Sequence, residues 1–239
     1  MITLGIAGIC GKMGTRIHML ANQDSAFKVT VGLEFPGHPG VNSKVHGVTV
    51  SADPLVMKNC DCFIDFTTPD ATIAHLSQLV AFKKCAVIGT TGLTGAQIKL
   101  IEEAGRTIPI VFSPNMSLGV QVLFNLARVC AKDLQGYSVK VSEAHHIHKK
   151  DAPSGTAKKI AEIINEEGFA ITNEDIQSVR EGEIIGDHKI VFESDVDTLV
   201  ISHSAKTRDI FAKGALRAAK WIVAQKEGLY SMGDVVNTK

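Results

Sequence analysis

Residues 8–14 read Gly-Ile-Cys-Gly-Lys-Met-Gly, and they directly follow the apolar, strand-like run Ile2–Ala7. After them, Met13–Ala21 places apolar residues at helical spacing, which predicts a helix. Small residues at a strand-to-helix turn let the backbone approach a pyrophosphate, whose charge is met by free amides and by the positive end of the helix dipole. The stretch therefore predicts a dinucleotide-binding loop that contains Gly8, Gly11, Lys12, Met13 and Gly14.

An acidic residue stands where a dinucleotide site requires one. Glu34 ends the next predicted strand, Lys28–Glu34, about 20 residues past the glycines, where a carboxylate accepts hydrogen bonds from the adenosine ribose. In an alternative interpretation the glycines only permit close packing of the helix on the strand, and Glu34 is a solvated strand end. The glycines and the acid together favour the nucleotide site.

Strand-like and helix-like segments alternate from Met1 to about Cys130, which is typical of repeated βαβ units. We therefore predict an α/β fold with a Rossmann-type doubly wound parallel sheet. The predicted strands are Ile2–Ala7, Lys28–Glu34, Cys62–Phe66, Cys85–Gly89 and Pro109–Phe112. The predicted crossover helices are Met13–Ala21, Ala71–Phe82, Gly95–Ala104 and Ser117–Ala131, and the Pro/Gly-rich stretch Phe35–Gly47 predicts a loop.

The pattern changes after Gln135. Ser138–His146, Lys189–Glu193 and Thr198–His203 read as strands, and Ser154–Glu167 is the clear long helix among them. This predicts a second, α+β sheet domain. A strong helical period returns in Arg208–Lys226, so we expect residues 1–116 plus 208–239 to form the dinucleotide-binding domain and residues 117–207 to form a substrate-binding and oligomerisation domain.

Composition excludes several classes of protein. The chain has 239 residues, 45% of them hydrophobic, with 25 Lys plus Arg against 25 Asp plus Glu, so disordered and fibrous classes do not fit. A balanced charge lacks the basic footprint of nucleic-acid binding, and no apolar run approaches the roughly 18–20 residues that span a bilayer. The five cysteines show no metal or disulfide spacing. We expect a cytoplasmic protein with reduced thiols and with no nucleic-acid or membrane partner.

The segment Glu143–Ala157 concentrates chemical groups, because it holds three of the nine histidines, two lysines and the start of a predicted helix. A strand would deliver an imidazole that exchanges protons near neutral pH, followed by cations and by a helix N-terminus that can hold an anion. The expected ligand is a small carboxylate. Two alternatives are a solvated charged loop and a metal site, but adjacent His145 and His146 on a strand point to opposite faces and make poor joint ligands.

Glu143–Ala157 resembles the signature of the dihydrodipicolinate reductase family of lysine and diaminopimelate biosynthesis, also called 4-hydroxy-tetrahydrodipicolinate reductases. The resemblance covers the whole chain. Further motifs that match in order are Gly8–Gly14, Phe66–Pro69, Gly89–Gly92, Ser113–Val120 and Arg208–Asp234.

The resemblance implies an enzyme that reduces dihydrodipicolinate or 4-hydroxy-tetrahydrodipicolinate to tetrahydrodipicolinate with NADH or NADPH. In the family pattern, His145 matches the proton donor, and Lys149 matches a substrate-binding position that also helps proton delivery. The other matched substrate-binding positions are His146, Ser154, Gly155 and Thr156. The matched cofactor positions beyond the glycine loop and Glu34 are Phe66, Gly89, Thr90, Thr91, Asn115 and Met116. The substrate is a small cyclic imine with two carboxylates, no metal is implied, and we expect a homotetramer.

Two positions depart from the family pattern. Cys10 stands where many members have glycine or another small residue, which puts a close pyrophosphate contact there in doubt. Phe35 follows Glu34 where some members carry an arginine that can hold a 2′-phosphate, so that Lys12 is the nearby cation. Because a carboxylate favours a free ribose diol over a phosphate, we expect a preference for NADH, with NADPH as a second cofactor.

Two other functions stay open. A redox-sensing regulator would keep Gly8–Glu34 but would need neither His145 nor Lys149. An oxidoreductase of the same two-domain plan could act on a different carbonyl or imine. The intact segment Glu143–Ala157 argues against the regulator, and an assay with the cyclic substrate distinguishes the two enzymes.

Overall fold

The computed structural model describes residues 1–237, which fall into two compact units. The first unit joins Met1–Met116 to the chain from Phe211 onward, and the second is Ser117–Ile210. The chain thus returns to the first unit at Phe211, near the expected Arg208. Each unit is described by itself below.

The first unit contains an eight-stranded sheet with the strand order β12-β7-β6-β5-β1-β2-β4-β3. Its neighbouring strands are parallel except for the antiparallel pair β3–β4. The strands are β1 (Ile2–Ala7), β2 (Phe27–Leu33), β3 (Lys44–Val45), β4 (Val48–Ser51), β5 (Cys62–Asp65), β6 (Cys85–Ile88), β7 (Pro109–Phe112) and β12 (Gly228–Tyr230). The helices are α1 (Lys12–Ala21), the 3-10 helix η1 (Pro54–Asn59), α2 (Pro69–Phe82), α3 (Gly95–Gly105), α6 (Asp209–Ile222) and α7 (Met232–Asn237).

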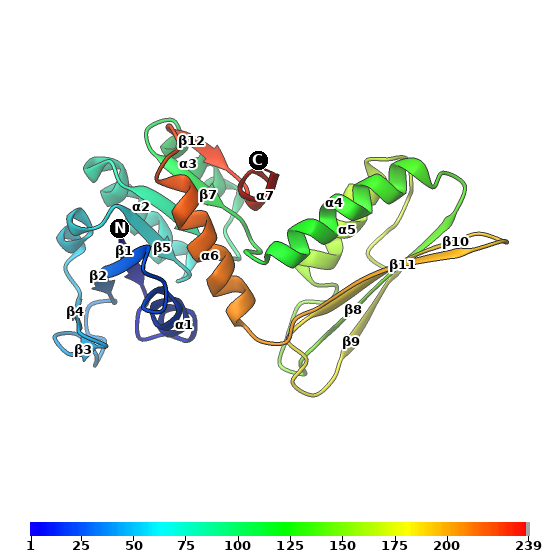
Figure 1. The fold of residues 1–239 in the computed structure, drawn as a ribbon. Coiled ribbons are helices and arrows are strands. Elements are labelled where there is room, and N and C mark those ends of the chain that lie inside the picture. Colours follow the sequence, from blue (N-terminus) through cyan, green and yellow to red (C-terminus); the bar gives the residue numbers. More distant parts are fainter. Residues whose placement is uncertain (238–239) are drawn as a thin grey trace. The chain divides into compact units, whose positions relative to one another are not determined.

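Helices cover both faces of this sheet, with α2 and α3 on one face and α1 and α6 on the other (Figure 1). One buried cluster joins Leu76 and Leu79 of α2, and Ile101 of α3, to strand residues such as Phe63 and Ile88. On the other face, the small residues of α6 allow close packing, since a Cβ on Gly214 would come within 1.7 Å of the Met116 carbonyl oxygen. The predicted α/β, doubly wound parallel sheet is confirmed.

Two predictions about this region are wrong. Phe35–Gly47 is not loop throughout, because Lys44–Val45 forms β3 and pairs with β4 across a tight turn. Ser117–Ala131 is not a crossover helix of the first sheet. Helix α4 (Leu118–Asp133) belongs to the second unit, where it packs against α5 and β11.

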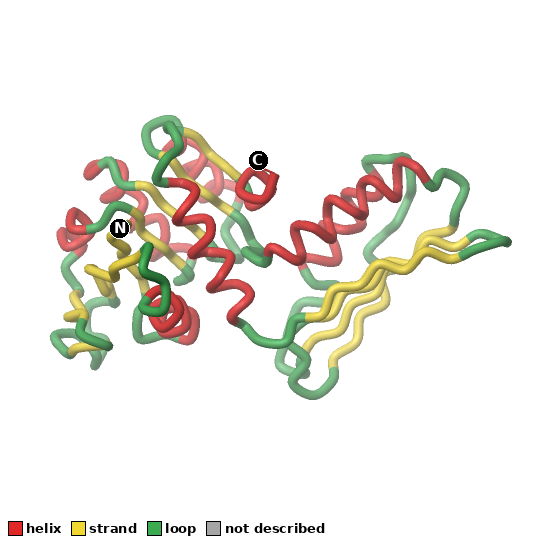
Figure 2. The backbone as a smooth tube through the Cα atoms, viewed as in Figure 1, coloured by secondary structure: helices red, strands yellow, loops and turns green. Residues whose placement is uncertain are grey.

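The second unit is a four-stranded sheet with two helices on one face, as the tube in Figure 2 shows. Its strand order is β11-β10-β8-β9, antiparallel except for the parallel pair β8–β9. The elements are α4, β8 (Ser138–His145), α5 (Gly155–Asn165), β9 (Ile176–Arg180), β10 (Asp187–Glu193) and β11 (Thr198–Ser204). Strand β9 was not predicted from the sequence.

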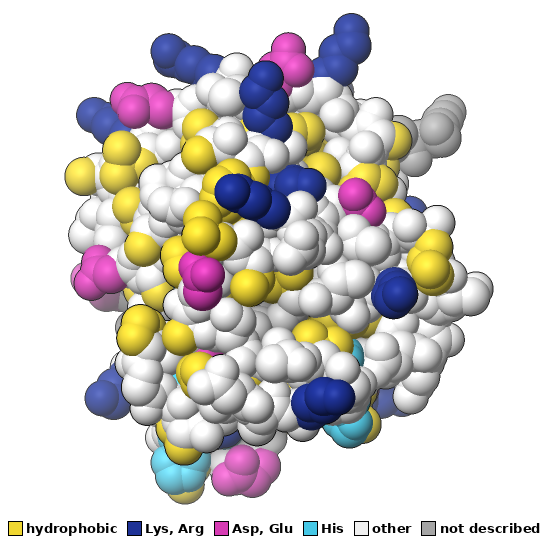
Figure 3. All heavy atoms as spheres, turned by 90° about the vertical axis from the view of Figure 1, so that its left-hand side faces the viewer, with side chains coloured by type: hydrophobic (Ala, Val, Ile, Leu, Met, Phe, Trp, Pro, Cys, Tyr) yellow, Lys and Arg dark blue, Asp and Glu magenta, His cyan; other side chains and the backbone are white. Residues whose placement is uncertain are grey.

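The surface carries mixed charges. On the face drawn in Figure 3, Lys and Arg side chains are spread among acidic and apolar ones. In the described part of the chain, no helix combines the length and the apolar character that crossing a bilayer requires.

Candidate functional site

The predicted dinucleotide-binding residues lie at one edge of the first sheet. The glycine loop follows β1, Glu34 follows β2, Phe66 follows β5, Gly89 follows β6, and Asn115 comes three residues after β7. These strands are neighbours in the order β7-β6-β5-β1-β2 and run parallel, so their carboxyl ends share one edge. The strand order reverses between β1 and β5, which is where doubly wound sheets bind ligands.

The glycine loop has a shape that larger residues would not permit. Gly8 has a φ of +62°, in the left-handed region, and the Gly11 N–H donates to its carbonyl oxygen at 2.8 Å. A Cβ on Gly14 would come 2.1 Å from that same oxygen. Helix α1 then begins at Lys12 without a side-chain cap or an acidic residue in its first turn. Its N-terminus is therefore suited to an anion such as a pyrophosphate.

Glu34 is turned toward this loop. Its Oε1 accepts the backbone N–H of Cys10 at 2.9 Å, which ties the end of β2 to the residue that departs from the family pattern. Burial, followed by the charge of Glu34, raises the pKa of the Cys10 thiol, so the thiol stays protonated. The loop thus presents amides and a carboxylate together, as a dinucleotide requires.

Asp65, which the sequence analysis did not single out, organises the loops after β5 and β6. The side chain is 2% exposed, and Oδ1 accepts the Thr67 N–H at 2.9 Å and the Thr67 hydroxyl at 2.6 Å. Oδ2 lies 2.7 Å from Nδ1 of His75 on α2. An aspartate that ends an otherwise apolar strand was the available signal. Its bonds hold the segment that carries Phe66.

Four other predicted cofactor positions differ in exposure. Thr90 is buried, and its hydroxyl lies 2.7 Å from that of Thr72, so only its backbone is available to a ligand. Thr91 is exposed. The backbone at Asn115 is held by Ser113, whose hydroxyl donates to the Asn115 carbonyl oxygen at 2.8 Å. Met116 is buried.

In the second unit, a row of polar side chains crosses all four strands. The register pairs Glu143 of β8 with Ser178 of β9 and with His188 of β10, and His188 with His203 of β11. Residues paired in this way share one face of the sheet. Ile190, two residues from His188, belongs to the core on that face. The row therefore continues the buried face of the sheet toward His145.

Glu143 lies at the centre of this row and is 2% exposed. One carboxylate oxygen is hydrogen-bonded to Nδ1 of His145 at very short range. The other accepts Nη2 of Arg180 at 2.8 Å and the backbone N–H of Ser154 at 3.3 Å. Arg180 also donates to the Asp151 carbonyl oxygen. A single buried carboxylate thus joins the predicted proton donor to the start of α5.

Burial and hydrogen bonding set the ionisation of these groups. Burial raises the pKa of Glu143, but the bonds from Arg180 and His145 outweigh it, so the net pKa is lowered and the group is ionised. Burial lowers the pKa of His145 even though Glu143 opposes it. Burial lowers the pKa of His188 to about 4.

The predicted substrate-binding residues surround the start of α5. The Ser154 hydroxyl accepts the Ala157 N–H at 3.2 Å and caps the helix, and Gly155 follows with open space where a Cβ would stand. Thr156 lies in the first turn, half-buried. The helix has no acidic residue in that turn. Its N-terminus is available to a carboxylate.

Lys149 and His146 lie in the turn after β8. The Lys149 ammonium pairs with Asp151 at 2.7 Å, and the backbone N–H of Lys149 donates to the His146 carbonyl oxygen at 3.1 Å. The His146 side chain is half-buried and lies beyond the end of the strand.

Comparison with known proteins assigns the chain to a family. The family models described as "Dihydrodipicolinate reductase, N-terminus" and "Dihydrodipicolinate reductase, C-terminus" match residues 2–116 and 119–236. The chain belongs to the dihydrodipicolinate reductase family. The 4-hydroxy-tetrahydrodipicolinate reductase of Geotalea daltonii is 38% identical, and that of Magnetococcus marinus 37% identical, with all of this chain and 100% and 99% of theirs covered.

A solved structure has the same fold. The dipicolinate-bound dihydrodipicolinate reductase from Paenisporosarcina sp. TG-14 matches with a TM-score of 0.81 over 97% of each chain, at 24% identity. The family predicted from the sequence motifs is confirmed, and the chain is an oxidoreductase.

Membership of the dihydrodipicolinate reductase family does not by itself assign the residues that the sequence analysis missed. Arg180 and His188 come from β9 and β10, and only the strand register brings them beside His145, whereas Glu143 lies on β8 itself. The alternation of Glu143 and His145 along β8 was the one signal in the sequence, since residues two apart share a face.

One group of possible metal ligands occurs within the described residues. Cys10, Glu34 and His38 bring possible ligand atoms within 4.8 Å of one another. However, Glu34 and His38 already accept backbone N–H groups, those of Cys10 at 2.9 Å and Gly40 at 3.0 Å. We place no metal there, and the expectation that none is bound stays a prediction.

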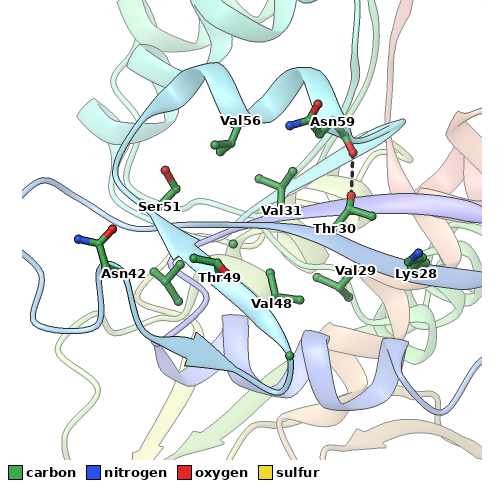
Figure 4. Close-up of a pocket in the computed structure, with 13 residues that line it drawn as sticks. Lys28, Val29, Thr30, Val31, Asn42, Val48, Thr49, Ser51, Val56 and Asn59 are labelled. Atoms are coloured by element: carbon green, nitrogen blue, oxygen red, sulfur yellow. Dashed lines mark hydrogen bonds between the residues drawn. The ribbon is translucent and has the colours of Figure 1, made fainter.

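A cavity of about 550 Å³ is lined by residues of β2 and β4 and of the segments beside them, and none of its lining residues is a predicted site residue (Figure 4). Valines from both strands line it, and the Thr30 hydroxyl donates across one side to the Asn59 carbonyl oxygen at 2.7 Å. Lys28 is the single charged residue among those lining it. Because the lining contains no histidine or carboxylate, we assign no acid–base chemistry to it.

Proposed function

We propose that the chain reduces dihydrodipicolinate, or its 4-hydroxy-tetrahydrodipicolinate form, to tetrahydrodipicolinate, with His145 as the general acid. As a family member the chain is a pyridine-nucleotide-dependent reductase. The observation that carries the proposal is the hydrogen-bonded chain from His145 through Glu143 to Ser154. It places a proton-exchanging imidazole beside a helix N-terminus that can hold a carboxylate.

The substrate carries two carboxylates, and the second unit offers groups for them. The backbone amides at the start of α5, at Gly155 and Thr156, would hold one carboxylate. Lys149 would supply a charge-assisted contact, exchanging its partner Asp151 for the substrate. His146 lies in the same turn and would line the site.

The first unit would hold the dinucleotide. The loop Gly8–Gly14 fits the pyrophosphate, and Glu34 fits the adenosine ribose, as argued from their geometry above. The backbone groups at Gly89, Thr91, Asn115 and Met116 would hold the nicotinamide amide. When bound, the reduced nicotinamide supplies the hydride.

His145 would supply the proton. Hydride addition to a ring carbon leaves developing negative charge on the substrate, and a proton from an imidazolium at Nε2 discharges it. Glu143 occupies Nδ1, so Nε2 is the nitrogen that can face the substrate. Lys149 would assist proton delivery by holding the substrate ring in the correct place.

We infer that NADH is preferred over NADPH. Glu34 would accept the ribose hydroxyls but repel a 2′-phosphate, and Phe35, which is exposed, provides no cation there. Lys12 at the start of α1 is the nearby cation that allows NADPH as a second cofactor.

We also infer a homotetramer formed through the second sheet. Helices α4 and α5 cover one face, while the other carries half-exposed valines such as Val179, Val191 and Val200 without a covering element among the described residues. A sheet with an uncovered apolar strip is suited to pairing with a copy of itself. Light scattering at micromolar concentration should give four times the chain mass, and a monomer mass would contradict the inference. The cytoplasmic location stays a prediction.

The decisive experiment is an assay with the synthetic cyclic substrate. Purified protein should consume NADH only when the substrate is present, and the product should be tetrahydrodipicolinate by mass spectrometry. Activity on another imine but not on this one would favour a different oxidoreductase. Dinucleotide binding without any turnover would favour the redox-sensing regulator.

A further inference from the structure

The hydrogen bond between Glu143 and His145 fixes where the imidazole carries its proton. An ionised carboxylate can only accept hydrogen bonds, so Nδ1 of His145 must be the donor. Arg180 and the Ser154 N–H hold the second oxygen of Glu143, which keeps the carboxylate in place. In a neutral ring with Nδ1–H, the other nitrogen, Nε2, has a lone pair and no proton to give.

The charges around His145 balance while the ring is neutral. Glu143 on β8 faces Arg180 on β9, and Lys149 faces Asp151 in the loop before α5, so two anions meet two cations. His188 on β10, whose ring centre lies 5.2 Å from that of His145, is neutral because burial lowers its pKa to about 4. A proton on His145 would therefore be an unbalanced charge in a largely buried setting.

A dicarboxylate changes this balance. Two negative charges arriving at Lys149 and the start of α5 would lie beside the ring and favour its protonated form. Nδ1 is already occupied, so the added proton must go to Nε2, which is the nitrogen from which a general acid has to donate.

We propose that Glu143 is a positioning residue that holds the proton of the neutral His145 ring on Nδ1, so that Nε2 is the free nitrogen in the ligand-free protein, and that one proton is taken up from solvent at Nε2 when a dicarboxylate binds. The inference rests on the proposed function, since it uses the same site. In each turnover the transfer of this proton from Nε2 to the substrate would return the ring to its neutral form, and the ring would stay neutral after product release until the next substrate binds. The acid is thus loaded only when substrate is present.

Isothermal titration calorimetry with dipicolinate, a dicarboxylate that cannot be turned over in the absence of a dinucleotide, tests the proposal. Titrations at about pH 7.5, one unit above the ordinary histidine value, in buffers of different ionisation enthalpy, give the number of protons taken up. We expect close to one proton per bound dipicolinate for the wild-type protein. Binding without proton uptake would overturn the inference and leave the proposed function standing. No binding at all would count against the proposed function.

Variants separate His145 from the other titratable groups. His145→Gln should still bind dipicolinate but take up close to no proton, and uptake that persists would overturn the assignment. Glu143→Gln should shift the pH midpoint of uptake downward by about one unit, because the ring loses its anionic partner. Glu193→Gln, the same change on the other face of the sheet, is the matched control and should leave uptake unchanged. An unshifted midpoint in Glu143→Gln, with the fold intact by circular dichroism, would exclude the role of Glu143.

Discussion

The carboxylate of Glu34 reaches from the end of β2 to the glycine loop and accepts the Cys10 N–H through Oε1 at 2.9 Å. This bond uses one oxygen and leaves the other for a ligand. It also puts a negative charge at the end of β2, where, under the proposed function, the adenosine ribose or its 2′-phosphate would bind. The cofactor preference should therefore depend on this residue and on its neighbour Phe35.

Changing Glu34 and Phe35 should move the cofactor preference in a defined direction. Glu34→Gln keeps an acceptor for the Cys10 N–H but loses the charge, so the KM for NADH should rise about tenfold while that for NADPH changes little. Phe35→Arg should lower the KM for NADPH by adding a cation. Steady-state kinetics with both dinucleotides measures this. A wild-type protein that binds NADPH much more tightly than NADH would contradict the assignment and point to Lys12.

Replacing His145 should remove chemistry and keep binding. His145→Gln retains a polar side chain of similar reach but has no proton to give, so kcat should fall by about 10²–10⁴ with a modest change in substrate KM. His148→Gln, an exposed neighbour, is the control and should behave as wild type. If the His145 variant keeps more than about a tenth of wild-type kcat while chemistry limits the rate, another group is the acid.

Replacing Lys149 should affect substrate affinity first. Lys149→Ala removes a charge-assisted contact of about 1.5–3 kcal/mol, so the substrate KM should rise by roughly one to two orders of magnitude. NADH affinity, measured by fluorescence titration, should not change. The adjacent exposed Lys150 provides the control through Lys150→Ala. Equal effects of the two alanines would indicate a general electrostatic contribution instead of a specific contact.

The glycine loop should not tolerate a methyl group at its closest approach. In Gly14→Ala the Cβ would meet the Gly8 carbonyl oxygen at 2.1 Å, so the loop must move, at a cost of about 1–3 kcal/mol in the free energy of unfolding and with loss of dinucleotide affinity. Gly95→Ala, at the first residue of α3 with open space around it, should be neutral or stabilising. Urea unfolding and NADH titration of both variants test this pair.

Stability should fall as the pH is lowered through the range in which His188 is neutral in the folded chain but protonated in the unfolded chain. Burial lowers the pKa of His188 to about 4 from an ordinary value of 6.5, so between these values the unfolded chain binds a proton that the folded chain does not. The free energy of unfolding should therefore drop by up to about 3 kcal/mol from this residue as the pH falls from about 6.5 to about 4. In His188→Gln the pH dependence should be shallower, and identical slopes in urea unfolding would exclude the effect.

Most strands of the first sheet could be predicted because each of them has a local sequence pattern typical of a strand. β1, β5 and β7 are short apolar runs between turn residues, and the buried parallel sheet needs such runs. The hairpin of β3 and β4 was missed because Lys44–Val45 is two residues long and sits in a Pro/Gly-rich context. Strand β9 was missed since Ile176–Arg180 is a polar edge strand whose pairing with β8 is set by distant chain.

The candidate site divides in the same way. Gly8–Gly14, Glu34 and His145–Thr156 are contiguous or regularly spaced, so residue types in order were enough to predict them as site residues. Asp65 and Arg180 act through contacts with segments that are distant in the sequence. The spacing of residues along the chain does not predict such contacts. Residues that hold a site are therefore harder to read from a sequence than residues that line it.

The chain leaves the first unit at Met116 and returns to it only at Phe211. During synthesis, β1 to β7 thus emerge long before α6 and β12. Until then the nascent sheet has an open edge beside β7, where β12 will pair. The surface at Met116, on which Gly214 of α6 packs, is also uncovered. Because domains fold as the ribosome releases them, the first unit stays incomplete until Ser117–Ile210 has been made. A chain truncated within that segment would expose this edge, so release of partial products carries an aggregation risk that is built into the order of the sequence.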